Sequence, residues 1–252
     1  MSLEQYSIKN QDCLNCAWKE YRANKEYEHR WQFANSILYK MCEDYPEHND
    51  ADVIVAKMWL IGRSYSAAIE RRKNADKNAS DFYYEDVANE ILKNGKELDE
   101  KIKNLNRKSE RYLDELFELH LYFMNILNKL TGLDKRSLAS KYLHFHCKNK
   151  VFIFDSTACK NIKKIVSKSR EKASKTGKCE NFDEEYIDFV MRVLKLKTYL
   201  EEKSEEKNEE GITPREIDTF LLNFEKIEKT IAEKRLQARS PSLLSGFRTE
   251  RF

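Results

Sequence analysis

The feature that most constrains this chain is its scarcity of turn-forming residues. Only six glycines and three prolines occur among its 252 residues. All-β folds and doubly wound α/β folds contain many tight turns, which depend on glycine and proline. The sequence therefore predicts long helices, and its length is enough for one large domain or two small ones with a buried core.

Charged residues make up 35% of the chain and hydrophobic residues 40%. Lys and Glu in such numbers are typical of solvated helix faces joined by ion pairs four residues apart. The net charge of +3 is small, but residues 148–178 carry ten Lys or Arg and two acids, a local balance of +8. Residues 201–210 carry six Glu and two Lys. We expect the basic block to suit a phosphate-bearing partner and the acidic block to be a solvated loop.

No window approaches the roughly 18 apolar residues that a membrane helix needs. The first 13 residues lack the basic and then apolar pattern of a signal peptide. Six cysteines without dense spacing suit a reducing compartment. We therefore expect a cytoplasmic protein without a membrane partner; the sequence indicates no oligomeric state.

Apolar residues recur at three- and four-residue steps through most of the chain, as on one face of a helix. The segment 109–132 is apolar on most sides from Leu113 to Leu130, so we expect this helix at the centre of the fold, with Gly132 closing it. Helices are expected over 13–45 (as one or two helices), 50–73, 81–105, 109–132, 134–147, 156–170, 182–202 and 211–236.

Three helix starts have clear signals. Asp50 or Asp52 is expected to cap the helix over 50–73, and Asp183 the helix over 182–202. Thr213, Pro214 and Glu216 match a capping box with proline at the first helical position.

The expected architecture is therefore all-α. A single domain over 1–239, either as one body or as two helical lobes around a groove, is followed by a tail over 240–252. Arg215 and Asp218, at the polar start of the last helix, either support a site near Asp155 or belong to an ordinary packing helix.

An uncharged run, Val151–Phe154, interrupts the helical pattern and ends at Asp155, and a basic helix is expected directly after it. A carboxylate held at a helix start behind an apolar wall can face a developing positive charge. Cleavage of a nucleobase from its sugar passes through an oxocarbenium-like state, which a carboxylate stabilises directly or by aligning a water molecule. The alternative is that Asp155 is a plain N-cap, worth about 1 kcal/mol.

Residues 131–166, TGLDKRSLASKYLHFHCKNKVFIFDSTACKNIKKIV, resemble the helix-hairpin-helix segment of DNA glycosylases. In that family a hairpin is followed by a helix, a short loop, the catalytic aspartate and another helix, and Asp155 falls at the aspartate's place. Lyase members carry a Schiff-base lysine early in the second hairpin helix. Lys135 lies at about that distance, and Lys141 follows one or two turns later. The resemblance implies a hairpin core over about 112–170, with Asp155, Lys135 and Lys141 as candidate catalytic residues.

The chain also departs from this family's pattern. Only Gly132 stands where the hairpin usually has two glycines, and Ile153-Phe154 replaces the usual proline-valine pair. The four-cysteine iron–sulfur loop of some members is absent, so no cofactor is expected.

Double-stranded DNA is the partner that the resemblance implies. Backbone N–H groups near Gly132 would meet a phosphate, and flanking lysines would add affinity by releasing counterions. Alternatively, these lysines form solvated helix faces, and Lys135 and Lys141 are ordinary surface residues. The candidate lysines for DNA binding are Lys148, Lys150, Lys160, Lys163, Lys164 and Lys168.

The segment over 60–73 combines small residues with Arg63, Tyr65 and Arg71. Small side chains allow close approach of a ligand or of another helix. In the first case Arg63 and Arg71 contact phosphate or base while Tyr65 stacks on the base; in the second, Arg63 pairs with a buried acid. If this segment shares a groove with Asp155, Arg63 and Tyr65 would form one site with it. The candidates for stacking on an extruded base are Tyr65, Trp59 and Tyr142.

Cys13 and Cys16 have the spacing of half a zinc site, and His144, His146 or Cys147 could complete it. Two thiols on an aromatic helix are more often core or surface residues. His144 and His146 would also point to different sides of a helix. No metal site is therefore expected.

The function that we expect is removal of a damaged or modified base from DNA by hydrolysis of its N-glycosidic bond. One alternative is a non-catalytic helical module that binds DNA or a protein partner. Another is a nucleotide binder built around Arg63 and Tyr65, belonging to a bacterial defence system.

Overall fold

The computed structural model describes residues 2–24, 26–29, 31–71, 81–169, 182–203 and 211–239. Helices form most of these segments, which confirms the all-α prediction. The helices are α1 (Gln11–Ala23), α2 (Glu26–His29), α3 (Gln32–Asp44), α4 (Ala51–Ser64), α5 (Asn89–Asn106), α6 (Tyr112–Thr131), α7 (Arg136–His146), α8 (Ser156–Ile165), α9 (Glu184–Lys203) and α10 (Pro214–Arg239), with a 3-10 turn at Leu3–Gln5 and a π-helical stretch at Tyr83–Ala88.

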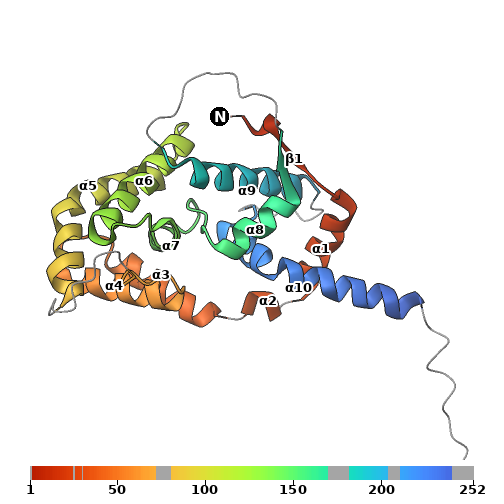
Figure 1. Cartoon of the computed structure of the whole chain (residues 1–252), viewed down its shortest axis with the longest axis horizontal. Helices are drawn as coiled ribbons and strands as arrows, with labels where there is room; N and C mark the ends of the chain where they lie inside the picture. Colours follow the sequence, from red (N-terminus) through yellow and green to blue (C-terminus); the bar gives the residue numbers. More distant parts are fainter. Residues whose placement is uncertain are drawn as a thin grey trace, which may run out of the picture.

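The described helices lie in two groups (Figure 1). One contains α3, α4, α5, α6 and α7; the other contains α1, α2, α8, α9 and α10. The chain passes from the first group to the second through residues 147–155, between α7 and α8. The starts of α10 and α3 and the end of α4 line a common pocket, so the two groups also meet there.

The α6 helix is buried along much of its length, as its composition predicted: Leu116, Leu119, Phe123 and Leu127 have no exposed surface. It ends where Gly132 adopts φ 65°, a left-handed conformation that glycine adopts at little cost. The Gly132 N–H donates to the Asn128 carbonyl at 2.7 Å.

The stretch over 13–45 forms three helices rather than the one or two expected. Asn24 is extended after α1, and Trp31 has φ 67°, so the helical path breaks at both places. Likewise, α4 ends at Ser64 instead of continuing to 73. Ser66 has φ 52°, and the Ala67 N–H donates to the Gly62 carbonyl at 2.8 Å. The small residues after Gly62 therefore form a turn that reverses the direction of the chain.

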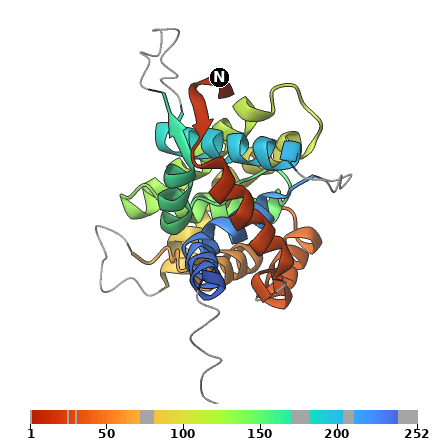
Figure 2. The same cartoon turned by 90° about the vertical axis from the view of Figure 1, so that its right-hand side faces the viewer.

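The basic helix is also shorter than expected. After Ile165 the chain forms a strand, β2 (Val166–Lys168), which pairs antiparallel with β1 (Tyr6–Ile8) beside α9 (Figures 1 and 2). The pairing joins Tyr6 to Lys168 and Ile8 to Val166. Val166 is fully buried. The strand that pairs with it lies about 160 residues earlier in the chain, so no local sequence pattern predicts that the helix gives way to a strand here.

The helix-start predictions are confirmed. Asp50 caps α4, and its carboxylate accepts the backbone N–H of Asp52 at 2.8 Å. The Asp183 carboxylate accepts the Glu185 N–H at 3.2 Å. At α10, Glu216 accepts the Thr213 N–H at 2.8 Å, and the Glu216 N–H donates to the Thr213 hydroxyl at 3.2 Å.

Residues 240–252 and most of the acidic block lie outside the described residues, as do 170–178 of the basic block. Among the helices that are described, none is both long and apolar enough to cross a membrane.

Candidate functional site

The run before Asp155 is an extended segment buried between α7 and α9. Val151, Phe152 and Ile153 are each at most 3% exposed. The Phe154 N–H donates to the Ser140 hydroxyl of α7 at 2.9 Å, and the Tyr186 hydroxyl of α9 donates to the Phe152 carbonyl at 2.9 Å. The segment is thus bonded on both sides, which holds the residue that follows it in a fixed position.

Asp155 is the N-cap of α8, and both of its carboxylate oxygens are engaged. Oδ1 accepts the Thr157 N–H at 2.9 Å, and Oδ2 accepts from the Lys141 ammonium at 3.1 Å. The Asp155 side chain is 25% exposed, whereas that of Lys141 is 4% exposed. The plain cap interaction is therefore present, and a buried lysine is added to it.

Lys141 joins three segments of the chain. Besides Asp155, its ammonium donates to the Tyr65 carbonyl at 2.9 Å, in the turn after α4. Lys135 contacts the same turn elsewhere, donating to the Ala68 carbonyl at 3.2 Å. Burial, followed by the neighbouring Arg71 charge, lowers the pKa of Lys135. Of the two candidate lysines, the structure thus brings Lys141 to Asp155.

The N-terminal part of α10 adds a second buried acid to this site. Asp218 is 4% exposed, and its Oδ2 accepts from Arg215 Nη1 at 3.2 Å. Burial raises the pKa of Asp218 to about 6; Arg215 opposes this, and the negative charge of Asp155 adds to it. Among the described residues Oδ1 of Asp218 has no hydrogen-bond partner. An unpaired buried oxygen is costly, which favours a bound polar group at this position.

Arg215 is held by a chain of hydrogen bonds that ends on the backbone of Val151. Its Nε and Nη2 donate to the Tyr39 hydroxyl, each at 3.2 Å, and that hydroxyl lies 2.6 Å from His144 Nε2. His144 Nδ1 lies 2.7 Å from the Val151 carbonyl, which can only accept. Nδ1 must therefore carry the proton, so Nε2 accepts from Tyr39. Burial and the Arg215 charge lower the pKa of His144 to about 3, so the ring stays neutral.

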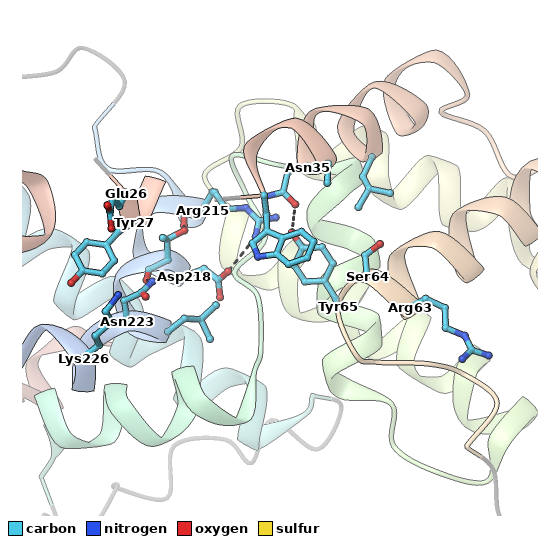
Figure 3. A pocket seen from close by; sticks show the side chains of 15 residues that line it. Glu26, Tyr27, Asn35, Arg63, Ser64, Tyr65, Arg215, Asp218, Asn223 and Lys226 are labelled. Carbon is cyan, nitrogen blue, oxygen red and sulfur yellow. Dashed lines mark hydrogen bonds and ion pairs between the residues drawn. The ribbon is translucent and has the colours of Figure 1, made fainter. Parts of the chain in front are cut away.

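A pocket of about 550 Å³ lies between α3, the end of α4 and α10 (Figure 3). The Tyr65 hydroxyl donates to Asn35 Oδ1 at 2.6 Å, and Arg215 lies 5.3 Å from the centre of the Tyr65 ring. In Figure 3, Arg215 and Asp218 lie between Tyr27 on one side and Tyr65 on the other. The lining combines aromatic, amide and charged side chains: Glu26, Tyr27, Trp31, Asn35, Arg63, Tyr65, Arg215, Asp218, Asn223 and Lys226, with smaller residues between them.

The sequence identified part of this pocket. Arg63 and Tyr65 line it, and Arg63 also pairs with Glu70. Tyr142 was wrong as a stacking candidate, because it has no exposed surface and packs on Phe123 with ring centres 4.7 Å apart. Tyr27, Trp31 and Asn35 were missed, because they belong to an expected helix and carry no motif of their own.

The candidate DNA-binding lysines lie mostly beside acids. Lys160 and Lys164 pair with Glu225 of α10 at 2.8 and 2.6 Å. Lys148 pairs with Glu43 at 2.9 Å, and Lys168 lies 3.6 Å from Asp188. The Lys150 ammonium lies over the Tyr112 ring, and Lys163 is exposed. Such exposed pairs contribute little to stability, yet they partly neutralise the local charge.

No protein-family model, curated protein or solved structure matches this chain. The site is therefore characterised by its own geometry. Within the described residues no group of three or more His, Cys, Asp or Glu is arranged to hold a metal ion, so Cys13 and Cys16 gain no further ligand there.

The raised pKa of Asp218 predicts a pH-dependent cost to stability. Its pKa of about 6 exceeds the ordinary value of about 3.9, so between these values the folded protein binds more protons than the unfolded chain. Stability from this group is present at low pH and is lost as the pH rises to about 6. Relative to wild type, the free energy of unfolding of Asp218→Asn should therefore rise by about 1–3 kcal/mol as the pH is raised from 4 to 7. Urea denaturation of both proteins at pH 4 and pH 7 measures this. A difference between the two proteins that is the same at both pH values would contradict the prediction.

Proposed function

We propose that this protein removes a nucleobase from DNA by hydrolysing the bond between the base and its sugar. The observation that carries the proposal is the Asp155–Lys141–Asp218 cluster beside an aromatic pocket. Lys141 joins the Asp155 carboxylate to the backbone of Tyr65, which lines the pocket. Asp218 lines it too, and the charge of Asp155 contributes to its raised pKa.

Asp155 suits the role of stabilising the sugar cation. In the reaction the C1′–N bond breaks, its electron pair leaves with the base, and the oxygen of a water molecule bonds to C1′. Positive charge develops on the sugar in between. The Thr157 N–H and the Lys141 ammonium fix one carboxylate oxygen each, so Asp155 would not need to reorient as the charge appears. It can also take the proton that the attacking water loses.

Asp218 suits the role of proton donor to the departing base. A carboxyl group with a pKa of about 6 is partly protonated near neutral pH. A pair of carboxyl groups in which burial raises the pKa of one is a common basis for acid and base roles in one site. Oδ1 of Asp218, which has no partner among the described residues, would carry the proton.

The pocket suits an extruded base. A base can reach such a site only by leaving the helical stack, and stacking on aromatic side chains offsets this cost. Tyr27 and Tyr65 line the pocket, and Trp31, 77% exposed, lies at it too. The turn at Gly132 and the exposed Lys163 are proposed phosphate contacts.

One observation favours a second candidate, a binder of free nucleotides. Four of the candidate DNA-binding lysines lie beside acids, which reduces the counterion release expected on duplex DNA: Lys148, Lys160, Lys164 and Lys168. Free nucleotides would use the same pocket without needing these lysines.

The test is abasic-site formation on duplexes carrying oxidised, deaminated, alkylated and hypermodified bases. We expect release from at least one of them. Salt-dependent DNA binding without release would leave a DNA-binding module. Binding of nucleotides, with neither release nor DNA binding, would favour the second candidate.

The rate of base release should depend on the protonation of Asp218. We expect single-turnover rates to fall about tenfold per pH unit above about pH 6, since only the protonated form donates. Asp218→Asn should be slower and should lose this dependence. A wild-type rate that rises between pH 6 and pH 8 would exclude Asp218 as the donor.

A further inference from the structure

The groove between α3 and α10 contains a second hollow of about 490 Å³ next to the first. The two hollows share Asn35 of α3 and Arg215 and Thr219 of α10. They therefore adjoin at these residues. Beyond them the second hollow is lined by Tyr21, Arg22, Gln32, Ser36, Tyr39, Thr213 and Glu216.

One nucleobase does not fill both hollows. At the roughly 30 Å³ that a water molecule occupies in the liquid, about ten non-hydrogen atoms take up about 300 Å³. The first hollow, of about 550 Å³, is already larger than that. A group joined to the base and directed past Asn35 and Thr219 would enter the second.

The charges of the second hollow compensate each other. Arg22 pairs with Glu216 at 2.8 Å, and Arg215 pairs with Asp218 at 3.2 Å. Each cation thus has an acid beside it, which favours an uncharged occupant over a phosphate.

The rest of its lining carries several polar side chains, among them the amides of Gln32 and Asn35. The Ser36 hydroxyl donates to the Phe33 carbonyl at 2.7 Å and the Thr219 hydroxyl to the Arg215 carbonyl at 2.9 Å, so each still offers lone pairs as an acceptor. The Tyr39 ring adds an apolar surface, while its hydroxyl is engaged by Arg215 and His144. An uncharged group that carries several hydroxyls on a compact ring matches this combination.

We propose that the second hollow binds a sugar attached to the base, so that the substrates are glycosylated bases. This rests on the proposed function for the reaction, but the binding itself can be measured without it. In this arrangement the base lies beside Tyr65 and Asp218, and the sugar lies beside Gln32, Ser36 and Tyr39.

The first experiment measures binding of two free nucleosides by calorimetry, glucosylated 5-hydroxymethyldeoxycytidine and 5-hydroxymethyldeoxycytidine. We expect the glucosylated nucleoside to bind at least tenfold more tightly. Ser36→Trp should remove this preference by filling the second hollow, whereas Ile37→Trp, at the next position of α3 and outside both hollows, should keep it. Ser36 and Ile37 are exposed, so both variants should fold, which their thermal midpoints will check. Equal binding of the two nucleosides, or a preference that survives Ser36→Trp, would overturn the proposal.

The second experiment separates this inference from the proposed reaction. Duplexes carrying either base are tested for base release with wild type and Ser36→Trp. We expect release of the glucosylated base to fall at least tenfold in the variant. Tight nucleoside binding without release from any duplex would support the sugar site and overturn the hydrolysis. Equal release of both bases, unaffected by Ser36→Trp, would support the hydrolysis and overturn the sugar site.

Discussion

Asp155→Asn is expected to lower the rate of base release by about 10²–10⁴-fold while DNA affinity stays within a factor of about three. Asparagine can accept the Thr157 N–H as aspartate does, so the helix cap survives. The negative charge that would face the sugar cation is lost. Single-turnover release on the best substrate, measured beside DNA binding, checks this expectation.

Asp50→Asn is the matched control. Asp50 caps α4 as Asp155 caps α8, with its carboxylate accepting a backbone N–H at 2.8 Å. Asp50→Asn should change the free energy of unfolding by less than about 1 kcal/mol. Asp155→Asn should cost more, about 1–4 kcal/mol, because it also leaves the buried Lys141 ammonium without its carboxylate. Only Asp155→Asn should affect base release. An Asp155→Asn protein as active as the Asp50→Asn protein would reduce Asp155 to a helix cap.

Gly95→Ala should destabilise the protein by about 1–3 kcal/mol. In the middle of an exposed helix this change would instead stabilise by about 1 kcal/mol. Here a Cβ at position 95 of α5 would lie 2.3 Å from the carbonyl oxygen of His48, which is backbone and cannot rotate away. His48 itself is held by Asp99 at 2.5 Å and by Tyr142 at 2.8 Å. Chemical denaturation gives the free energy of unfolding.

Gly62→Ala is the comparison for this prediction. Its Cβ would lie 3.5 Å from the nearest atom, the Ala68 Cα, which is ordinary contact. We expect a change within about 1 kcal/mol, in either direction. If both glycine variants were equally stable, the close approach of His48 to α5 would be disproved.

The parts of the site that the sequence predicted depend on neighbours in the chain. An acid directly after Val151–Phe154 and before a basic helix predicted that Asp155 begins a helix, and it caps α8. The capping box of α10 has the same local origin, because its two residues are three positions apart. Which lysine meets Asp155 was left open, since Lys135 and Lys141 are both on α7 or at its start. Both contact the turn after α4, but only Lys141 also reaches Asp155, at 3.1 Å.

The sequence by itself determined the all-α class, most helix starts and the buried run that positions Asp155. These follow from periodicity and capping, which act within a few residues. The tertiary structure decided the ends of α4 and α8, the pairing of β1 with β2, and the pocket itself. Tyr27, Asn35, Tyr65 and Asp218 come from four separate segments and meet only when the two groups of helices pack together. No sequence pattern predicts this arrangement. The burial of apolar surface stabilises the packing of the two groups, and it requires no fixed spacing in the sequence between the residues involved.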